Sequence, residues 1–421
     1  MSSYTLRYFD IPGFAETSRL MLLASNSNWT EEHPEWPQEK PNQPFGRLPV
    51  LVEKHTDGSP DFVLCESGTI ERYLARSLGF FPSDPKKAAL QEQLRDQISD
   101  VRTAGMQIVT DPSDGTKERF NALLVKLKEI IPKALEDNGS SASSQGTGLT
   151  FIDFYVYSFF KSALVNFPER LPEYADVLIS IISPKVAKVI SNVIAEPNSL
   201  PPRDLRTMSS YTLRYFDLPG LAETSRLMLL ASNSNWTEEH PEWPQEKPKQ
   251  PFGRLPVLIE KCADGSPDFV LCESGAIERY LARGLGFFPS DPRKAALQEQ
   301  LRDQMADIIV AYAQATVSPS ESTKEKLNVL LSKFKEVLPK ALEENGSSIS
   351  SQGNGLTYID FSVYSFFKAV IWNCLERASE HTGSFKDLWS PEVIKLLSNV
   401  AAEPSLQHHV SDDKSLLTCL Q

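Results

Sequence analysis

Cysteine is scarce in this sequence of 421 residues, and no block of lysine or arginine occurs in it. The five cysteines are shared unequally between the two halves of the chain, so they cannot form a common disulfide framework. No Cys-x-x-Cys pair or Cys/His cluster suggests a metal site, and we expect none. The formal net charge of −12 argues against nucleic acid and anionic membranes as partners, because no basic segment offsets it.

Two further kinds of segment are missing. The first residues contain no basic stretch followed by an apolar run, and no apolar run approaches the length that spans a bilayer. We therefore expect a cytoplasmic protein. Hydrophobic residues make up 41% and charged residues 23% of the chain, which is ordinary for a globular protein with a core.

The chain consists of two closely similar copies of one unit. Residues 1–10 return at 208–217, and the register continues without a gap to Glu196-Pro197 against Glu403-Pro404. Each residue of the first copy therefore has a counterpart 207 positions later. Solenoid and propeller repeats have periods of roughly 20–50 residues, so a repeat this long indicates a duplicated pair of domains.

The two copies differ unevenly. Residues 1–75 and 208–282 differ at few positions, most of them conservative, whereas 101–109 and 308–316 keep only Ala104/Ala311 and Gln107/Gln314 in common. Two explanations are open at this point. The copies have drifted unevenly after a recent duplication, or a shared site lies beside a diverging one.

The first eighty residues of each copy have the pattern of a small α/β domain. Alternation predicts strands at 5–9, 48–53 and 61–66, and periodicity predicts helices at 15–26 and 67–78 with Ser67 as N-cap. A loop rich in proline lies between the first helix and the second strand.

The rest of each copy has the pattern of a helical domain. Helices are predicted at 88–109 and 116–135, and Thr150 with Asp153 forms a capping pattern before an apolar run. The expected fold class is therefore α/β plus all-α, with the pair of domains repeated twice. The expected domains are 1–80, 85–196, 208–287 and 292–410, with a short, stiff, proline-containing linker at 197–207.

Several motifs in a fixed order resemble the cytosolic glutathione S-transferases, most closely the sigma-like branch with a tyrosine in its active site. They are a strand ending in Tyr-Phe, Gly13-Phe14-Ala15-Glu16, Trp36-Pro37-Gln38-Glu39-Lys40, 44–49, 66–75 and the Thr150/Asp153 cap. The resemblance covers almost the whole of both copies. It implies a thioredoxin-like domain that binds glutathione, followed by an all-helical domain that shapes the pocket for the second substrate.

Tyr8 and its counterpart Tyr215 are the candidate catalytic residues. A thiol is mostly protonated at neutral pH, and a phenol hydroxyl that donates to the sulfur stabilises the nucleophilic thiolate. Tyr8 is placed at the carboxyl end of a strand, where ligands gather in open α/β sheets. Tyr4 lies on the same face of that strand, so a tyrosine here is also compatible with a core role. The resemblance favours the catalytic role.

The resemblance also implies the glutathione-binding residues. Pro49 and Pro256 match the family's cis-proline, and Leu48 and Leu255 before them would offer backbone groups to the cysteinyl part of glutathione. Taken alone, a proline at the start of a strand is more often trans.

Two further pairs in each copy would hold the ends of glutathione. Glu66-Ser67 and Glu273-Ser274 begin a helix, whose free N–H groups suit the γ-glutamyl carboxylate, although the serine alone is also a plain cap. Trp36 with Lys40, and Trp243 with Lys247, match a pattern that binds the glycyl carboxylate, and without the resemblance they would equally form a surface patch.

Other positions depart from the family or are ambiguous. Relatives usually have arginine after the glycine of the Gly-x-Ala-Glu motif, where this chain has Phe14 and Leu221, which weakens the expected support for the thiolate. Asp96 and Asp100, with Asp303 and Asp307 in the second copy, lie either near the other unit's ligand or on a solvated helix face.

The expected function is conjugation of the glutathione thiolate to small hydrophobic electrophiles, with glutathione as co-substrate and no other cofactor. The two sites would share the glutathione pocket and differ in the electrophile pocket. There, Arg102 and Met106 of the first copy correspond to Ile309 and Ala313 of the second. The alternatives are a glutathione-dependent isomerase or peroxidase, or a non-catalytic structural or binding protein. The units are expected to pair as an internal pseudo-dimer or between chains as a homodimer.

Overall fold

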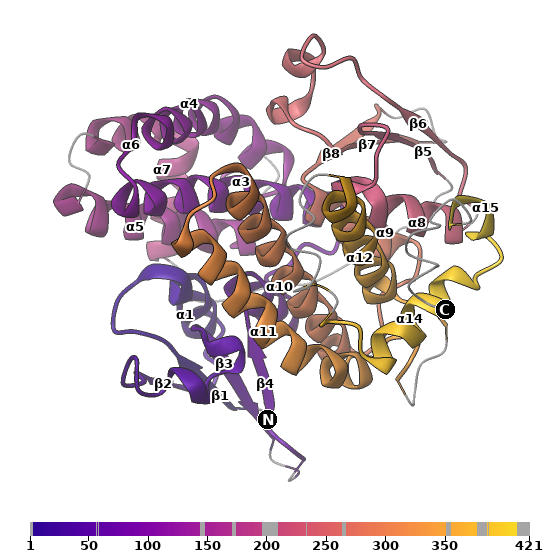
Figure 1. The fold of residues 1–421 in the computed structure, drawn as a ribbon. Helices are drawn as coiled ribbons and strands as arrows, with labels where there is room; N and C mark the ends of the chain where they lie inside the picture. Colours follow the sequence, from indigo (N-terminus) through magenta and orange to yellow (C-terminus); the bar gives the residue numbers. More distant parts are fainter. Residues whose placement is uncertain are drawn as a thin grey trace.

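The computed structural model describes residues 3–55, 57, 59–143, 148–170, 174–195, 209–232, 234–262, 267–350, 355–376, 385 and 387–410. The chain forms two units of the same design, each a four-stranded sheet with helices followed by a helical domain (Figure 1). This confirms the predicted fold class and its repetition. The predicted linker at 197–207 lies outside the described residues.

The first sheet has the strand order β2-β1-β3-β4. Its strands are β1 (Ser3–Arg7), β2 (Trp29–Glu32), β3 (Val50–Lys54) and β4 (Phe62–Cys65). The strand β1 is parallel to β2 and antiparallel to β3, and β3 is antiparallel to β4. The second sheet repeats this as β6-β5-β7-β8, with β5 (Ser209–Arg214), β6 (Trp236–Glu239), β7 (Val257–Cys262) and β8 (Phe269–Cys272).

Two helices accompany each sheet. They are α1 (Glu16–Ala24) and α2 (Ser67–Ser77) in the first unit, and α8 (Glu223–Ala231) and α9 (Ser274–Gly284) in the second. The prediction of Ser67 as N-cap is wrong, because Glu66 occupies that position with φ of 70° and Ser67 is the first helical residue. The turn from β4 into α2 is so tight that the residue between them takes the left-handed conformation.

The helical domains follow. The first contains α3 (Pro85–Thr110), α4 (Asp114–Asp137), α5 (Phe151–Arg170), α6 (Ala175–Ile181) and α7 (Pro184–Ala195). The second contains α10 (Pro292–Val317), α11 (Glu321–Glu344), α12 (Tyr358–Glu376), α14 (Pro391–Ala401) and α15 (Gln407–Val410). The cap before α5 is formed through the Asp153 carboxylate, which accepts from the Thr150 N–H at 2.7 Å and from its hydroxyl at 2.8 Å.

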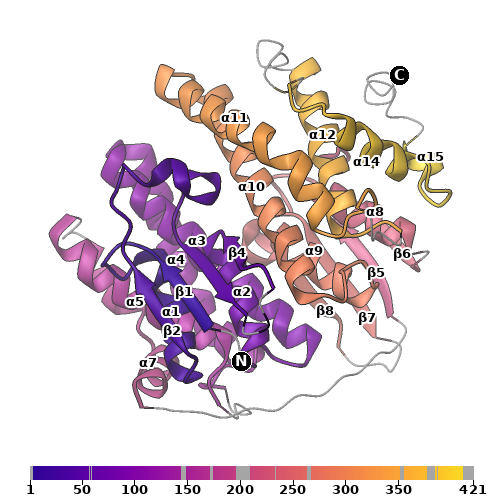
Figure 2. The same ribbon diagram turned by 90° about the horizontal axis from the view of Figure 1, so that it is seen from below.

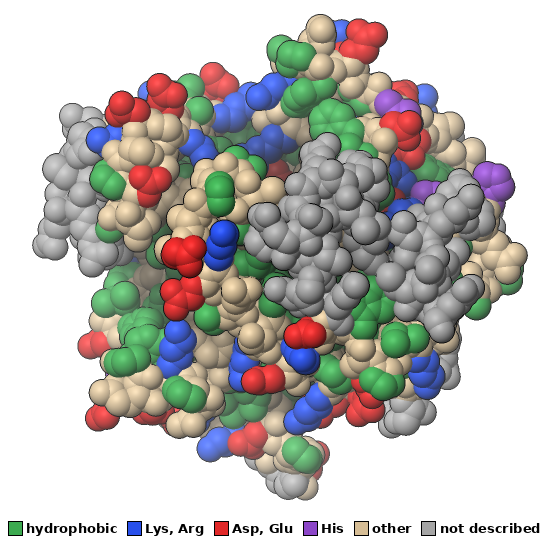
Figure 3. Space-filling view, viewed as in Figure 1, with side chains coloured by type: hydrophobic (Ala, Val, Ile, Leu, Met, Phe, Trp, Pro, Cys, Tyr) green, Lys and Arg blue, Asp and Glu red, His purple; other side chains and the backbone are tan. Residues whose placement is uncertain are grey.

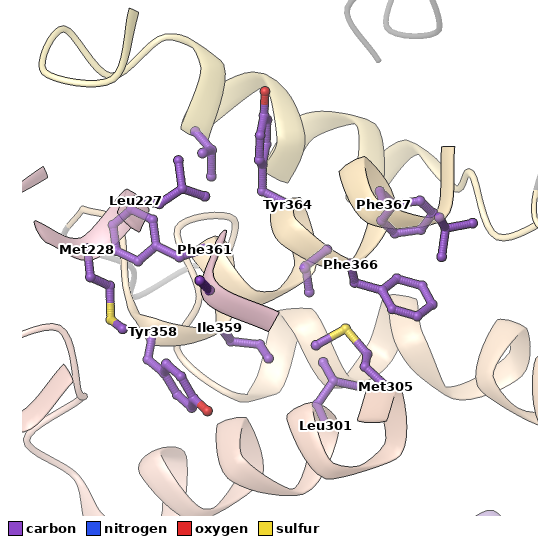
Figure 4. Packing of buried hydrophobic residues seen from close by; sticks show 14 of the residues in the cluster. Leu227, Met228, Leu301, Met305, Tyr358, Ile359, Phe361, Tyr364, Phe366 and Phe367 are labelled. Carbon is purple, nitrogen blue, oxygen red and sulfur yellow. The ribbon is translucent and has the colours of Figure 1, made fainter. Parts of the chain in front are cut away.

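Each unit has a core that joins its two domains. In the second unit, Phe361 of α12 and Leu227 and Met228 of α8 belong to the same buried cluster as Leu301 and Met305 of α10 (Figure 4). The helix α12 therefore packs on the α/β domain as well as on its own helical neighbours. Among the described helices, none is both long and apolar enough to cross a membrane. On the face seen in Figure 3, acidic and basic side chains are interspersed.

The two units lie side by side (Figure 2), with α3 against α9 and α10 against α2. Their contacts are reciprocal. The side-chain oxygen of Gln300 accepts from the Cys65 N–H at 2.8 Å, and that of its counterpart Gln93 accepts from the Cys272 N–H at 2.7 Å. These buried hydrogen bonds tie the edge of each sheet to the long helix of the other unit.

Charged side chains are buried in the same contact. Arg279 donates to Glu92 at 3.1 Å and to Asp96 at 3.0 Å, and Arg72 donates to Asp303 at 2.7 Å. The surface of α3 and α10 that bears these aspartates is therefore not a solvated helix face. Desolvation makes such charges costly unless they are paired, and here each has a partner across the two units.

Candidate functional site

Register places the predicted residues at one edge of the first sheet. Arg7 pairs with Val50, and Val50 pairs with Cys65. Tyr8 directly follows Arg7, Glu66 directly follows Cys65 and Pro49 directly precedes Val50, so all three lie at the same end of these paired strands. The second sheet has the same row, Arg214 with Val257 and Cys272, and brings Tyr215, Pro256 and Glu273 to its edge. The Leu48–Pro49 and Leu255–Pro256 bonds are cis, as the resemblance predicts.

The two tyrosines lie one residue beyond their strands, although the predicted strand included Tyr8. The Tyr8 N–H still donates to the Glu32 carbonyl at 3.1 Å, and its hydroxyl accepts from the Phe14 N–H at 3.2 Å. The Tyr215 hydroxyl likewise accepts from the Leu221 N–H at 3.2 Å. Both side chains are buried. The N–H bonds from Phe14 and Leu221 hold each hydroxyl against the turn that leads into the following helix.

Glycine is required in that turn. Gly13 has φ of +63°, and a Cβ added to it would lie 2.7 Å from the Tyr8 hydroxyl oxygen. Gly220 has φ of +73°, and the corresponding distance to the Tyr215 hydroxyl is 2.9 Å. The turn therefore approaches the hydroxyl more closely than any other residue would allow.

The hydroxyls remain protonated at neutral pH. Burial raises the pKa of Tyr8 above its usual value, while the Phe14 N–H and the guanidinium groups of Arg102 and Arg19 oppose this. Burial also raises the pKa of Tyr215, opposed by the Leu221 N–H and by Arg226. Each tyrosine is thus available as a hydrogen-bond donor to an anion.

Glu66 and Glu273 lie between the two units. The Gln304 side-chain amide donates to Glu66, and the Arg47 guanidinium lies 3.8 Å from it. In the second unit Gln97 donates to Glu273, and Arg254 lies 3.9 Å from it. Each glutamate is therefore approached by a glutamine of the other unit and by an arginine of its own.

The carboxyls of these glutamates have unusual pKa values. Burial, followed by the nearby Asp307 carboxylate, raises the pKa of Glu66 to about 8, although Arg47 opposes the shift. Burial, followed by Asp100 and Asp96, raises the pKa of Glu273 to about 8. A cation placed at this point would lower these values again, because it would favour the charged carboxylate.

The loop that bears Trp36 and Lys40 forms the outer part of the site. Trp36 packs edge-on against Phe9, with ring centroids 5.6 Å apart, and Trp243 packs the same way on Phe216 at 5.7 Å. Lys247 lies 5.9 Å from the Trp243 ring centroid. These contacts fix the loop beside the residue that follows each catalytic tyrosine candidate.

Lys40 also lines a cavity of about 370 Å³ between the units. Its wall contains Phe45, Gly46 and Arg47 of the first unit and residues of α10 and α11, among them Gln304. Arg47 and Gln304, which line this cavity together with Lys40, also contact Glu66. Within the described part of the chain, no group of three or more metal-ligating side chains is present.

Sequence reasoning placed Asp100 and Asp307 either near the other unit's ligand or on a solvated face, but it did not single out Gln97, Gln304 or the arginines that pair with these aspartates. Arg47 pairs with Asp307 and Arg254 with Asp100, and Gln304 and Gln97 reach the opposite glutamates. These residues are identical in the two copies, but most of the residues around them are identical too, so this does not distinguish them. Cys65 and Cys272 are free and buried, and burial raises the pKa of both thiols, which disfavours the reactive thiolate.

Comparison with known families identifies the domains. The family model described as "Glutathione S-transferase, N-terminal domain" matches residues 4–76 and again 211–283. The model described as "Glutathione S-transferase, C-terminal domain" matches residues 300–413. The N-terminal domain is therefore present twice, in the positions that the internal repeat predicts.

Individual relatives cover one unit of the chain. Glutathione S-transferase 1 of Ascaris suum is 31% identical over 167 residues, which are 37% of this chain and 78% of the relative. Hematopoietic prostaglandin D synthase of Gallus gallus is 30% identical over 157 residues, 37% of this chain and 76% of the relative. The crystal structure of the glutathione S-transferase from Ascaris lumbricoides is 26% identical, with a TM-score of 0.37, and the match covers 48% of this chain and 97% of that structure.

Proposed function

The chain belongs to the glutathione S-transferase family, and from this premise we propose that each of its two units conjugates glutathione, through its sulfur, to a small hydrophobic electrophile. The observation that carries the proposal is the buried tyrosine hydroxyl at the sheet edge, present in both units with the same N–H donor. Glutathione serves as co-substrate, and the proposal requires no metal or other cofactor. The cytoplasm, where glutathione is kept reduced, is the proposed compartment.

In the proposed mechanism, the tyrosine hydroxyl donates to the glutathione sulfur. The turn N–H that it accepts from, contributed by Phe14 or Leu221, makes the hydroxyl a better donor. This hydrogen bond stabilises the thiolate, which attacks the electrophile by substitution or conjugate addition. A hydrogen bond to a charged group contributes about 1.5–3 kcal/mol, enough to shift the thiol by one to two pKa units.

The remaining residues are proposed to hold the two ends of glutathione. Lys40 with Trp36, and Lys247 with Trp243, bind the glycyl carboxylate. The start of α2 at Ser67, and of α9 at Ser274, binds the γ-glutamyl carboxylate. Glu66 and Glu273 pair with the γ-glutamyl ammonium. Their raised pKa supports this pairing, because the site favours a cation at that point.

We propose that the electrophile pockets differ between the units. Arg102, on α3, is buried, and Met106, one turn later, is 54% exposed. Ile309 and Ala313 replace them on α10, which makes the second pocket less polar. With Tyr215→Phe and Tyr8→Phe used to silence one site at a time, the two remaining sites should prefer different electrophiles. Identical preferences would sink this part of the proposal.

We also propose that the two units form an intramolecular pseudo-dimer. Support comes from the reciprocal contacts of Gln93 and Gln300 and from the paired charges between α3 and α9. Light scattering should then give a compact particle with the mass of one chain. A mass of two chains, retained on dilution, would show that the units pair between chains.

A glutathione-dependent isomerase is the second candidate, because one relative is named a prostaglandin D synthase. An isomerase would use the same thiolate and return glutathione unchanged. Mass spectrometry of the reaction with an activated aryl halide, an α,β-unsaturated carbonyl compound and a prostaglandin endoperoxide separates the two. A glutathione adduct supports transfer, an isomerised product without adduct supports the alternative, and glutathione binding without any product indicates a non-catalytic protein.

A further inference from the structure

A buried arginine for which the described residues provide no ion pair lies beside the turn that contacts the first unit's tyrosine. Arg102, on α3, is 8% exposed, and its Nη2 atom has no hydrogen-bond partner among the described residues. Its guanidinium carbon lies 5.3 Å from the ring centroid of Phe14 and 5.3 Å from that of Tyr155 on α5. The cation therefore contacts two aromatic rings, one of which belongs to the residue whose N–H contacts the Tyr8 hydroxyl, while the Tyr155 ring is also contacted by Arg95 at 5.1 Å.

The other charged groups near Tyr8 are already neutralised. Arg19 of α1 donates to Glu31 at 2.7 Å and to Glu16 at 3.3 Å, and Glu16 also accepts from Lys161 of α5 at 2.6 Å. His33 contacts the Tyr8 backbone carbonyl at 3.0 Å and makes no hydrogen bond to its hydroxyl among the described contacts.

A carboxylate on a neighbouring helix that feels the charge of Arg102 has its own partner. Glu71 of α2 feels the charge of Arg102 but accepts from Arg95 at 3.1 Å. Arg102 thus remains as the one cation beside Tyr8, in the described part of this unit, for which no ion pair is present.

The second unit lacks this arrangement. The counterparts of Phe14, Arg102 and Tyr155 are Leu221, Ile309 and Ser362, so all three members are replaced together. Arg226 lies 5.7 Å from the Tyr215 ring centroid but is paired with Glu223 at 2.9 Å and with Glu238. Glu223 is itself held by Lys368 and His409, each at 2.8 Å, and His240 contacts the Tyr215 carbonyl at 3.0 Å.

We propose that Arg102 is a positioning residue that stabilises the thiolate through Tyr8 in the first unit, and that the two sites therefore ionise glutathione to different extents. The inference rests on the proposed function. It supplies, from α3 and in one unit alone, the cation that is absent at position 14. A cation beside Tyr8 that has no ion pair among the described residues strengthens the hydroxyl as a donor and attracts the negative sulfur, whereas the second unit depends on its tyrosine and turn N–H.

The size of the effect can be estimated from the charge. One cation beside the tyrosine that would bind the sulfur, in a partly buried site, should lower the thiol pKa by about one unit, a tenfold change in the ionisation constant. At a pH below both pKa values, the first site should then hold about ten times more thiolate than the second.

The test isolates each site in the intact chain. Tyr215→Phe leaves the first site and Tyr8→Phe leaves the second, and the pKa of bound glutathione is measured from its thiolate absorbance and from the pH profile of kcat. We expect the first site to titrate about one unit lower. Arg102→Ile, which installs the residue of the second copy, should raise the thiol pKa at the first site to that of the second site. Arg102→Lys should restore part of the difference in thiol pKa between the sites.

The reverse change provides a second variant in case Arg102→Ile fails to fold. Leu221→Phe, Ile309→Arg and Ser362→Tyr together should lower the thiol pKa of the second site by about one unit. Equal pKa values at the two sites, or values unmoved by these substitutions, overturn the role of Arg102 while leaving the proposed function intact. If glutathione binds to neither site, the proposed function and this inference both fail.

Discussion

Replacing Glu66 and Glu273 by glutamine should stabilise the glutathione-free protein increasingly as the pH rises. The pKa of each carboxyl is about 8 in the folded protein, against the ordinary value of 4.5. A carboxyl with a raised folded-state pKa contributes most stability below the unfolded value and loses it as the pH rises through the folded value. The loss therefore runs from about pH 4.5 to pH 8 and is complete just above it.

The magnitude follows from proton linkage. Relative to acidic pH, each site lowers the free energy of unfolding by about 2 kcal/mol at pH 6 and by about 4 kcal/mol at pH 8. Each site therefore costs about 2 kcal/mol of stability between these pH values. Glutamine has no proton to lose and can still accept from Gln304 or Gln97. The double variant should then lose about 4 kcal/mol less than the parent protein over this interval.

Urea unfolding at pH 6 and pH 8 measures this difference, since other titrating groups are common to both proteins and cancel. Each single variant should account for about half of it. Adding glutathione should reduce the difference, because the γ-glutamyl ammonium would lower the pKa of the carboxyls. Parallel pH dependences of parent and double variant would refute the reasoning, whatever their absolute stabilities.

Two further predictions concern the turn and the contact between units. Gly13→Ala should lower the rate of conjugation at the first site at least tenfold, because the added Cβ meets the Tyr8 hydroxyl. The control Gly115→Ala, whose Cβ would have nothing within 4 Å, should leave the rate unchanged. Equal rates in the two variants would contradict this prediction. Glu92→Ala should cost about 1.5–3 kcal/mol in urea unfolding, because it removes the buried carboxylate that Arg279 and Arg283 share, although Arg279 keeps Asp96 and Arg283 keeps Glu299. The control Glu129→Ala, which removes an exposed ion pair with Lys126, should cost under about 1 kcal/mol. An equally small cost for Glu92→Ala would show that the buried pairs do not stabilise the contact between the units.

Much of the fold could be predicted because local pattern and tertiary structure agree in it. Apolar alternation marked β3 and β4, and periodicity marked α3, within a few residues of their ends. The strand β2 escaped because it is a short edge strand with exposed Thr30 and Glu32, which gives it little apolar signal. Ser67 was misassigned because the left-handed backbone of Glu66 depends on the tight turn and not on local propensity.

The site was predictable only in the parts that one unit supplies by itself. The tyrosine, the cis-proline and the Glu-Ser turn follow from motifs within about seventy residues. Gln304, which reaches Glu66 from α10, and the pairing of Asp307 with Arg47 depend on how the two units meet. The role proposed for Arg102 depends on two aromatic rings from other segments, and no sequence spacing connects them.

The most direct test of the proposed function is the rate of glutathione conjugation by the intact protein beside Tyr8→Phe, Tyr215→Phe and the double variant. Each single change should remove the share of its own site, and the double variant should fall at least tenfold, because both thiolates lose a hydrogen bond of about 1.5–3 kcal/mol. Folding is checked by the urea midpoint, which should change little. Full activity in the double variant would contradict the account, because the tyrosines would then have no part in the reaction.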